Sequence, residues 1–436
     1  MTLEIRDTLT GKVEPVDVVN GGPLRLYVCG PTVYDRAHIG HGRTYLYFDI
    51  ARRYFRARNI PVRHVMNITD FEDKITQRAR DLGMSWQELG RAQETSFLEQ
   101  MDRLGVLRPH VVPRASEFVP PMIRVIQRLE RMGRIHRSGD EWIFQPRGRA
   151  DGRNFPVGQE LAEHAVPEPD HSFVVRGPND REFMVWKRQE APDPSWPSPW
   201  GNGMPGWHVE CFTMAERFLG LPVDLHGGGT DLIYPHHYAE NELTLALASR
   251  LFSRRFLHTA FVTENGRKMS KSIGLLVPLS DALDRYGRDA LRFYLLGRPY
   301  HVRLEWSESE AERAKALLED VQRRVREAMN GTGSPRIGLE RLRALRQGMI
   351  QDVGTELSID RALERLLTWA KTLGSHSTVE SGSRSQTLTE LQAIADLTGI
   401  PLLTETAASG GRSKNRTGPR GPRPRATKSR DAPRAG

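Results

Sequence analysis

Residues 24–41 read LRLYVCGPTVYDRAHIGH, and this stretch decides the fold. The apolar run from Leu24 to Val28 ends at Cys29 and predicts a short buried strand. A Gly-Pro loop follows, and apolar residues at helical spacing predict a helix from about His41. A second strand is expected at 62–66. Strand, loop and helix in alternation are typical of a parallel sheet with right-handed crossovers.

Further elements follow the same patterns along the chain. Apolar residues at helical spacing predict a helix around 122–129, with a stop at Gly133. We expect strands at 142–144, 222–225 and 256–262, a helical bundle whose leucines fall at 339–367, and a Ser-rich loop at 375–388. In a split parallel sheet the ligand lies where the strand order reverses, beyond the carboxyl ends of the strands. Cys29 and the Gly227–Gly229 run each follow a predicted strand, so we expect them to face one crevice.

Composition places the chain among soluble globular proteins with two or three domains. It has 436 residues, of which 38% are hydrophobic and 27% charged. No apolar run approaches the ~18 residues that span a bilayer, so no membrane partner is expected. The N-terminus lacks the apolar core of a signal peptide, and the chain has only two cysteines. We therefore expect a cytoplasmic protein without a disulfide.

The basic charge is concentrated at the C-terminus. Residues 411–436 hold nine arginines and lysines against one aspartate, so all but one unit of the net charge of +9 lies there. This Gly-, Pro- and Arg-rich tail is predicted to be disordered. It could bind RNA phosphates, or it could be a solvated terminus without a function.

Two cysteines, a histidine and a glutamate form a candidate zinc site. Cys29, Cys211, His236 and Glu240 supply two thiolates, an imidazole and a carboxylate, a set that zinc accepts. His236 and Glu240 are four residues apart and would share a helix face. Glu242 is the alternative carboxylate, but it would lie off that face. Each residue taken alone is more often a structural core residue.

Two further motifs offer phosphate-binding groups. His38, Gly40 and His41 open the first helix, whose free N–H groups favour anions. Lys268 and Lys271 lie in the run KMSKS, between two glycines, and could stabilise charge on phosphates. The alternatives are incidental histidines and a solvated basic turn.

Four other residues could line a substrate pocket, namely Thr69, Trp207, His226 and Asp231. Asp231 could accept a hydrogen bond from a ribose or an α-ammonium group. Core packing is an equal alternative for Trp207 and His226, and helix capping for Thr69.

From about Leu24 to Glu305 the sequence resembles cysteinyl-tRNA synthetases, which are class I aminoacyl-tRNA synthetases. The resemblance rests on YVCGPTVYD at 27–35, HIGH at 38–41, NITD at 67–70, GWHVEC at 206–211, HGGG at 226–229, PHH at 235–237 and KMSKS at 268–272. It implies ATP, with Mg²⁺, at Thr32, His38, Gly40, His41, Gly228, Asp231, Lys268 and Lys271. It implies cysteine at Cys29, Thr69, Trp207 and His226, and Zn²⁺ at Cys29, Cys211, His236 and Glu240, with His38, His41, Lys268 and Lys271 as the catalytic groups.

The resemblance also implies an activity. The family activates L-cysteine with ATP and transfers it to the 3′ end of tRNA(Cys), and we expect a monomer that does the same. A related branch passes the activated cysteine to a small amino-sugar amine, and this ligase is the second hypothesis. A specialised or inactive copy of the synthetase is the third.

The implied fold class is α/β, a class I synthetase-type Rossmann-like parallel sheet with an inserted connective domain, then a helical bundle and a disordered basic tail. The expected parts are the first catalytic half (1–146), the connective insertion (147–205), the second catalytic half with the KMSKS loop (206–280), the bundle (281–404) and the tail (405–436).

Overall fold

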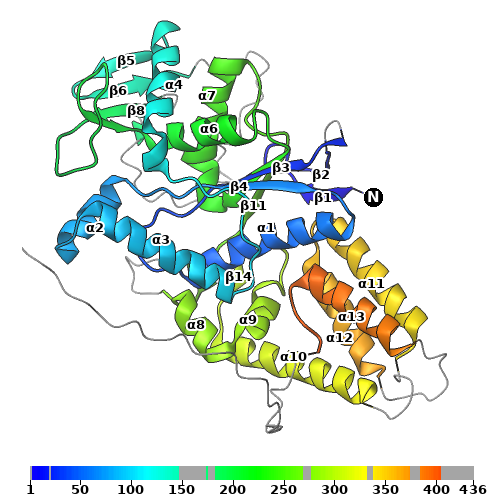
Figure 1. Ribbon diagram of the computed structural model, residues 1–436. Coiled ribbons are helices and arrows are strands. Elements are labelled where there is room, and N and C mark those ends of the chain that lie inside the picture. The colour runs from blue at the N-terminus through cyan, green and yellow to red at the C-terminus, as the bar shows by residue number, and fades with distance from the viewer. Residues whose placement is uncertain are drawn as a thin grey trace, which may run out of the picture. The chain divides into compact units, whose positions relative to one another are not determined.

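Figure 1 shows the computed structural model of the chain, coloured from blue at the N-terminus to red at the C-terminus. It describes residues 2–18, 21–146, 173–174, 182–268, 276–330, 337–373 and 383–403. The expectations for the KMSKS residues after Lys268, for most of the connective insertion and for the basic tail lie outside these ranges. Residues 1–403 group into one compact unit.

The centre of the fold is a four-stranded sheet in which every neighbouring pair of strands is parallel. Its strand order is β11-β10-β3-β4, with β3 at Leu24–Val28, β4 at Val62–Met66, β10 at Leu225–Gly229 and β11 at Phe256–Thr259. Helix α1 (Ile39–Ala57) connects β3 to β4, while the chain reaches β10 on the other side of β3 only much later. The strand order therefore reverses between β3 and β10, which is where such sheets bind ligands.

Strand β3 separates two hydrophobic cores because its side chains alternate between the faces of the sheet. Leu24, Leu26 and Val28 pack into the core that contains α1 and the C-terminal helices. Tyr27 and Cys29 point into the second core. The first cysteine is therefore carried by the face that lies opposite α1.

The second core holds a separate antiparallel sheet and the helices beside it. The sheet has the order β5-β6-β8-β7, with β9 paired to β8. Helix α4 contacts α6, and α6 contacts both β8 and α7, as Figure 1 shows. The bounds are α4 Val119–Arg131, β5 Ile135–Ser138, β6 Glu141–Phe144, β7 Phe173–Val174, β8 Glu182–Arg188, β9 Gly203–Pro205, α6 Trp207–Phe218 and α7 Tyr238–Ala248.

Helices dominate the rest of the described chain. Helix α1 contacts α8, α9, α11 and α13, so the C-terminal helices pack directly on the helix that connects β3 to β4. The remaining elements are β1 Leu3–Arg6, β2 Val13–Val16, α2 Asp73–Leu82, α3 Trp86–Arg103, β12 Val262–Glu264, β13 Arg267–Lys268, α8 Leu279–Tyr286, α9 Arg288–Leu295, β14 Leu304–Glu305, α10 Glu308–Met329, α11 Leu339–Gly354, α12 Ile359–Lys371 and α13 Arg384–Thr398.

A buried ion pair fixes the bundle to the sheet domain. Arg292 of α9 is fully buried and donates to Asp49 of α1 at 2.7 Å and to the carbonyl of Thr398 at 2.8 Å. Gly399 ends α13 at φ 70°, and a Cβ there would lie 2.1 Å from the Arg292 guanidinium. Only glycine fits this position, because both the backbone angle and the space exclude a side chain.

The α/β fold class and the strands at 24–28, 62–66 and 142–144 are confirmed, while three expectations about elements were wrong. Residues 222–225 are not the strand; β10 begins at Leu225 and contains the glycine run. The expected strand at 256–262 is two strands, β11 and β12, which belong to different sheets. The Ser-rich stretch is partly helical, because Ser383 caps α13 through a capping box with Gln386.

Within the described residues, none of the helices is both long enough and apolar enough to cross a membrane.

Candidate metal centre and substrate cavity

Four elements carry the candidate zinc ligands to one place. Cys29 follows β3, and Cys211 lies in the second turn of α6. His236 belongs to a short helical turn, 233–237, that leads directly into α7, where Glu240 lies in the first turn. All four side chains are buried.

Their ligand atoms form one compact cluster. One sulfur, nitrogen or oxygen from each of Cys29, Cys211, His236 and Glu240 lies within 4.8 Å of every other. The two Sγ atoms are 3.7 Å apart, and Cys29 Sγ is 3.8 Å from Glu240 Oε1. His236 Nε2 lies 3.4 Å from the same oxygen. Glu242 is also buried but belongs to neither of the two ligand clusters found among the described residues.

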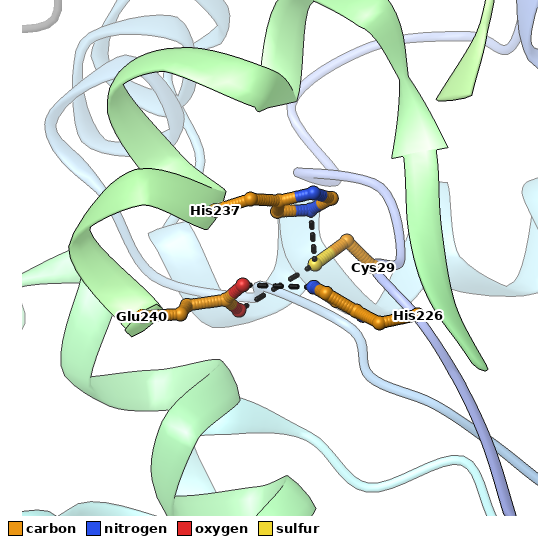
Figure 2. Close-up of side chains that lie close together, drawn as sticks. All are labelled: Cys29, His226, His237 and Glu240. Carbon is orange, nitrogen blue, oxygen red and sulfur yellow. Dashed lines mark hydrogen bonds and ion pairs between the residues drawn. The ribbon is translucent and has the colours of Figure 1, made fainter. Parts of the chain in front are cut away.

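A second ligand set overlaps the first. It replaces Cys211 and His236 by His226 of β10 and His237, and it shares Cys29 and Glu240. Figure 2 shows His237 and His226 on opposite sides of the Cys29 sulfur, with the Glu240 carboxylate pointing toward both Cys29 and His226. His226 Nε2 lies 2.8 Å from Glu240 Oε2, and His237 Nε2 lies 3.3 Å from Cys29 Sγ.

Hydrogen bonds at the far side of each imidazole decide which set suits a metal. His226 Nδ1 faces the carbonyl of Tyr27 at 3.0 Å, so it must carry the proton there. Its Nε2 is then occupied by Glu240. His236 differs, since its Nε2 is buried without a hydrogen bond among the described residues. Its Nδ1 lies 3.0 Å from His208 Nδ1, so one of these two nitrogens donates to the other and the Nε2 of His236 stays available.

The first set therefore fits a metal better than the second. It holds an orphaned ring nitrogen, and it contains both sulfurs, a donor set that suits a soft or borderline ion such as zinc. The second set contributes the outer hydrogen bonds that orient Glu240 and Cys29.

Burial controls the protonation of the cluster. It raises the pKa of Cys29 well above its usual value, and it also raises the pKa values of Cys211 and Glu240. It lowers the pKa values of His236 and His237 well below theirs. Burial therefore shifts each of these five groups toward its neutral form, and a bound cation would oppose this shift for the thiols and the carboxyl.

A cavity of about 270 Å³ opens above the cluster. The sequence-predicted residues that line it are Cys29, Thr32, His38, Gly40, His41, Trp207 and Asp231. Thr69, His226 and Gly228 are buried, and none of these three described residues lines the cavity. Trp207 also stacks on His236, with ring centroids 4.0 Å apart, so one residue contacts both the cavity and the cluster.

His38 and His41 cap their own helix. His38 Nδ1 accepts from the N–H of Gly40, and His41 Nδ1 accepts from the N–H of His38. Because both Nδ1 atoms are acceptors, a neutral ring carries its proton on Nε2. The cap therefore sets the tautomer that donates hydrogen bonds from the outer edge of each ring.

The glycines of β10 allow close contact between backbones. A Cβ on Gly227 would lie 1.8 Å from the carbonyl oxygen of Leu257, and one on Gly229 would lie 2.4 Å from the Asp231 carboxylate. Glycine is needed because a neighbouring strand and a side chain fill those spaces.

The loop that holds His38 also contacts the chain that follows the KMSKS run. Ile39 donates to the carbonyl of Val277, and Leu279 donates to that of Ala37. Leu276 lines the cavity. The backbone of Lys268 pairs in β13, while its side chain and Lys271 lie outside the described residues.

Sequence reasoning missed two groups beside the cluster. His237 and His258 form a buried pair 2.6 Å apart, and Thr8 follows at 2.7 Å. Glu210 is buried and accepts from Thr69. His237 and Glu210 each adjoin a predicted ligand in the sequence, which is the only signal that could have pointed to them.

Comparison with known proteins gives the class. Residues 15–316 match the family described as "tRNA synthetases class I (C) catalytic domain". Among solved structures, methionyl-tRNA synthetase from Mycobacterium tuberculosis, in complex with methionyl-adenylate, is 16% identical and covers 86% of this chain and 90% of its own, with a TM-score of 0.59. The Agrobacterium radiobacter K84 agnB2 LeuRS in its ternary complex is 13% identical and covers 88% and 84%, also with a TM-score of 0.59. The fold is thus that of a class I synthetase.

Relatives with higher identity give the family. "Cysteine--tRNA ligase" from Anaeromyxobacter sp. (strain K) is 40% identical over 341 residues, which are 75% of this chain and 69% of that protein. The protein of the same name from Thermococcus onnurineus is 38% identical over 324 residues, or 73% and 67%. The chain belongs to the cysteinyl-tRNA synthetase family.

Proposed function

We propose that this protein is an ATP-dependent cysteine–tRNA ligase, which makes cysteinyl-adenylate and transfers the cysteinyl group to tRNA(Cys). The observation that carries the proposal is the cluster of both cysteines with His236 and Glu240, because its member Cys29 also lines the cavity of His38 and His41. Family membership supports the activity, because its curated relatives carry that name.

In this proposal the ligands of a zinc ion are Cys29, Cys211, His236 and Glu240. Bound there, zinc would supply a Lewis acid that takes the substrate's thiolate and so selects cysteine over serine, whose hydroxyl is harder and more basic. Trp207 forms the wall that contacts both His236 and the cavity. His226 holds the Glu240 carboxylate through Oε2, at 2.8 Å.

The first step joins cysteine to AMP. A carboxylate oxygen of cysteine attacks the α-phosphorus of ATP, the α–β bond breaks and pyrophosphate leaves. His38 and His41 donate hydrogen bonds to phosphate oxygens from their Nε2 edges, and Gly40 leaves room for the nucleotide. Thr32, Gly228 and Asp231 are the further ATP contacts that we propose, and Lys268 and Lys271, with Mg²⁺, neutralise the charge that develops on the phosphates.

In the second step the terminal ribose hydroxyl of the tRNA attacks the carbonyl carbon, and AMP leaves. The alternative acceptor, a small-molecule amine, is not favoured, because the curated relatives are named as tRNA ligases. We further propose that the protein is a monomer and that it works in the cytoplasm. A reducing compartment would keep the two free cysteines available as zinc ligands. The boundaries of the five chain segments expected from the sequence also remain a proposal.

Two assays on the same sample test the function. Cysteine-dependent exchange of pyrophosphate into ATP reports the first step, and charging of total tRNA reports the second. We expect both to be positive with cysteine and at background with serine. Robust exchange without cysteinyl-tRNA would contradict the tRNA acceptor, and absence of exchange would contradict the enzyme.

A further inference from the structure

A buried chain of hydrogen bonds joins the loop that carries Cys29 to the helix that carries Cys211. Asn67 Oδ1 accepts from the N–H of Gly30 at 2.9 Å, and Asn67 Nδ2 donates to Thr69 Oγ1 at 3.2 Å. Thr69 Oγ1 then donates to Glu210 Oε2 at 3.1 Å. We call Asn67, Thr69 and Glu210 the relay; each of them is about 1% exposed.

The backbone fastens the Cys29 loop to the same segment. Thr69 donates to the carbonyl of Pro31 at 3.2 Å, and Val33 donates to the carbonyl of Thr69 at 3.1 Å. A Cβ on Gly30 would lie 1.5 Å from the carbonyl oxygen of Asn67, so the two loops touch backbone to backbone. The position of Cys29 therefore depends on the segment that contains Thr69.

Glu210 is the member of the relay that lies in helix α6. It precedes Cys211 in α6, while Thr69 follows β4, so their hydrogen bond bridges 141 residues of sequence. The sulfurs that this bridge brings together are only 3.7 Å apart. A tetrahedral ion needs them at a fixed separation, and such outer hydrogen bonds commonly fix ligand geometry.

We propose that Glu210, acting through Thr69, is a positioning residue that sets the Cys29–Cys211 sulfur separation for the metal. Glu210 belongs to neither ligand set among the described residues and does not line the cavity. This inference rests on the proposed metal centre, and the plain alternative is a polar bridge that stabilises the core and nothing else.

Cobalt(II) is the probe, because its thiolate charge-transfer and d–d bands report ligand geometry without any turnover. We expect Glu210→Leu, which removes the acceptor, to weaken Co²⁺ binding to the full-length protein about 10- to 100-fold and to alter the bands. Glu210→Gln should stay close to wild type, since an amide oxygen can accept from Thr69. Thr213→Val is the matched control: it also removes a buried hydroxyl bond, Thr213 Oγ1 to the Val209 carbonyl, from α6 but lies off the relay.

The outcomes test the metal centre and the relay separately. Wild-type protein that binds no Co²⁺ contradicts the metal centre itself. Wild-type binding together with a folded Glu210→Leu variant of unchanged affinity and spectrum contradicts only the relay. The relay is also contradicted if Glu210→Gln or Thr213→Val weakens Co²⁺ binding as much as Glu210→Leu does. If Glu210→Leu does not fold, Thr69→Val against Thr69→Ser decides in the same way, because serine keeps the donor and valine loses it.

Discussion

The Sγ atoms of Cys29 and Cys211 lie 3.7 Å apart although 182 positions separate the two residues in the sequence. One follows β3 and the other lies in α6, and both side chains belong to the second hydrophobic core. The chain has no other cysteine. Both thiols are buried, and Cys29 also lines the cavity, so a metal held between them would lie next to the space for a small ligand.

Replacing one sulfur should damage cysteine selection before it damages ATP binding. Cys211→Ser exchanges a soft ligand for a hard one, so we expect the kcat/KM for cysteine activation to fall at least about tenfold. The Kd for ATP, measured by calorimetry, should not change, because the nucleotide groups lie on another loop. Normal preference for cysteine over serine in this variant would contradict the metal pocket.

Two nearby carboxylates allow a matched test of the fourth ligand. Both Glu240 and Glu242 are buried, but only Glu240 lies with the sulfurs. We expect Glu240→Gln to lower zinc affinity about 10- to 100-fold and Glu242→Gln to leave it unchanged. Zinc can be titrated against a chromophoric chelator. Equal losses in the two variants, or a loss confined to Glu242→Gln, would show that the ligand is misassigned.

His38 both caps α1 and lines the cavity, and two substitutions separate these roles. Asparagine is a strong N-cap but lacks the Nε2 donor, so His38→Asn should keep the free energy of unfolding and lower the exchange rate about 10²-fold. His38→Ala removes both the cap and the donor, so its exchange rate should fall as well and its free energy of unfolding should drop by about 1 kcal/mol. Urea unfolding and pyrophosphate exchange measure the two effects. A fully active His38→Asn variant would leave the imidazole with a capping role alone.

The sequence predicted the chemistry of the site better than its surroundings. The predicted ligands could be found because each sits in a short motif whose neighbours restrict its identity, as in GWHVEC around Cys211. The strand at 225–229 was misplaced because its glycines read as a loop, whereas they are needed where Leu257 and Asp231 approach the backbone. The roles of His226 and His237 depend on hydrogen bonds across the fold, to Tyr27 and His258, which no local pattern reveals.

A buried histidine far from the cluster predicts how stability depends on pH. Burial, with the nearby Arg52 guanidinium, lowers the pKa of His64 well below its usual value, and its Nδ1 lies 3.3 Å from Arg52 Nη1. His110 faces it as well, through a hydrogen bond from the His64 N–H at 3.0 Å. The folded state thus keeps His64 neutral at a pH where the unfolded chain takes up a proton.

Because only the unfolded chain takes up this proton, the free energy of unfolding decreases as the pH falls. Stability from His64 is fully present above the unfolded pKa of about 6.5 and falls as the pH drops below it, by at most about 1.4 kcal/mol per pH unit. We expect His64→Gln to remove this share of the loss between pH 7.0 and 5.5, as measured by urea unfolding. Other buried histidines add their own slopes, so the comparison is the difference between the variant and wild type. Identical slopes would contradict the assignment.

The central claim is that a metal held by Cys29 and Cys211 recognises cysteine by its sulfur. X-ray absorption of the zinc-loaded protein counts sulfur ligands directly, at a Zn–S distance of about 2.3 Å. We expect two sulfur ligands in the free protein, three after L-cysteine is added, and two after L-serine is added. A count that stays at two with saturating cysteine, or zinc without sulfur ligands in the free protein, would contradict it.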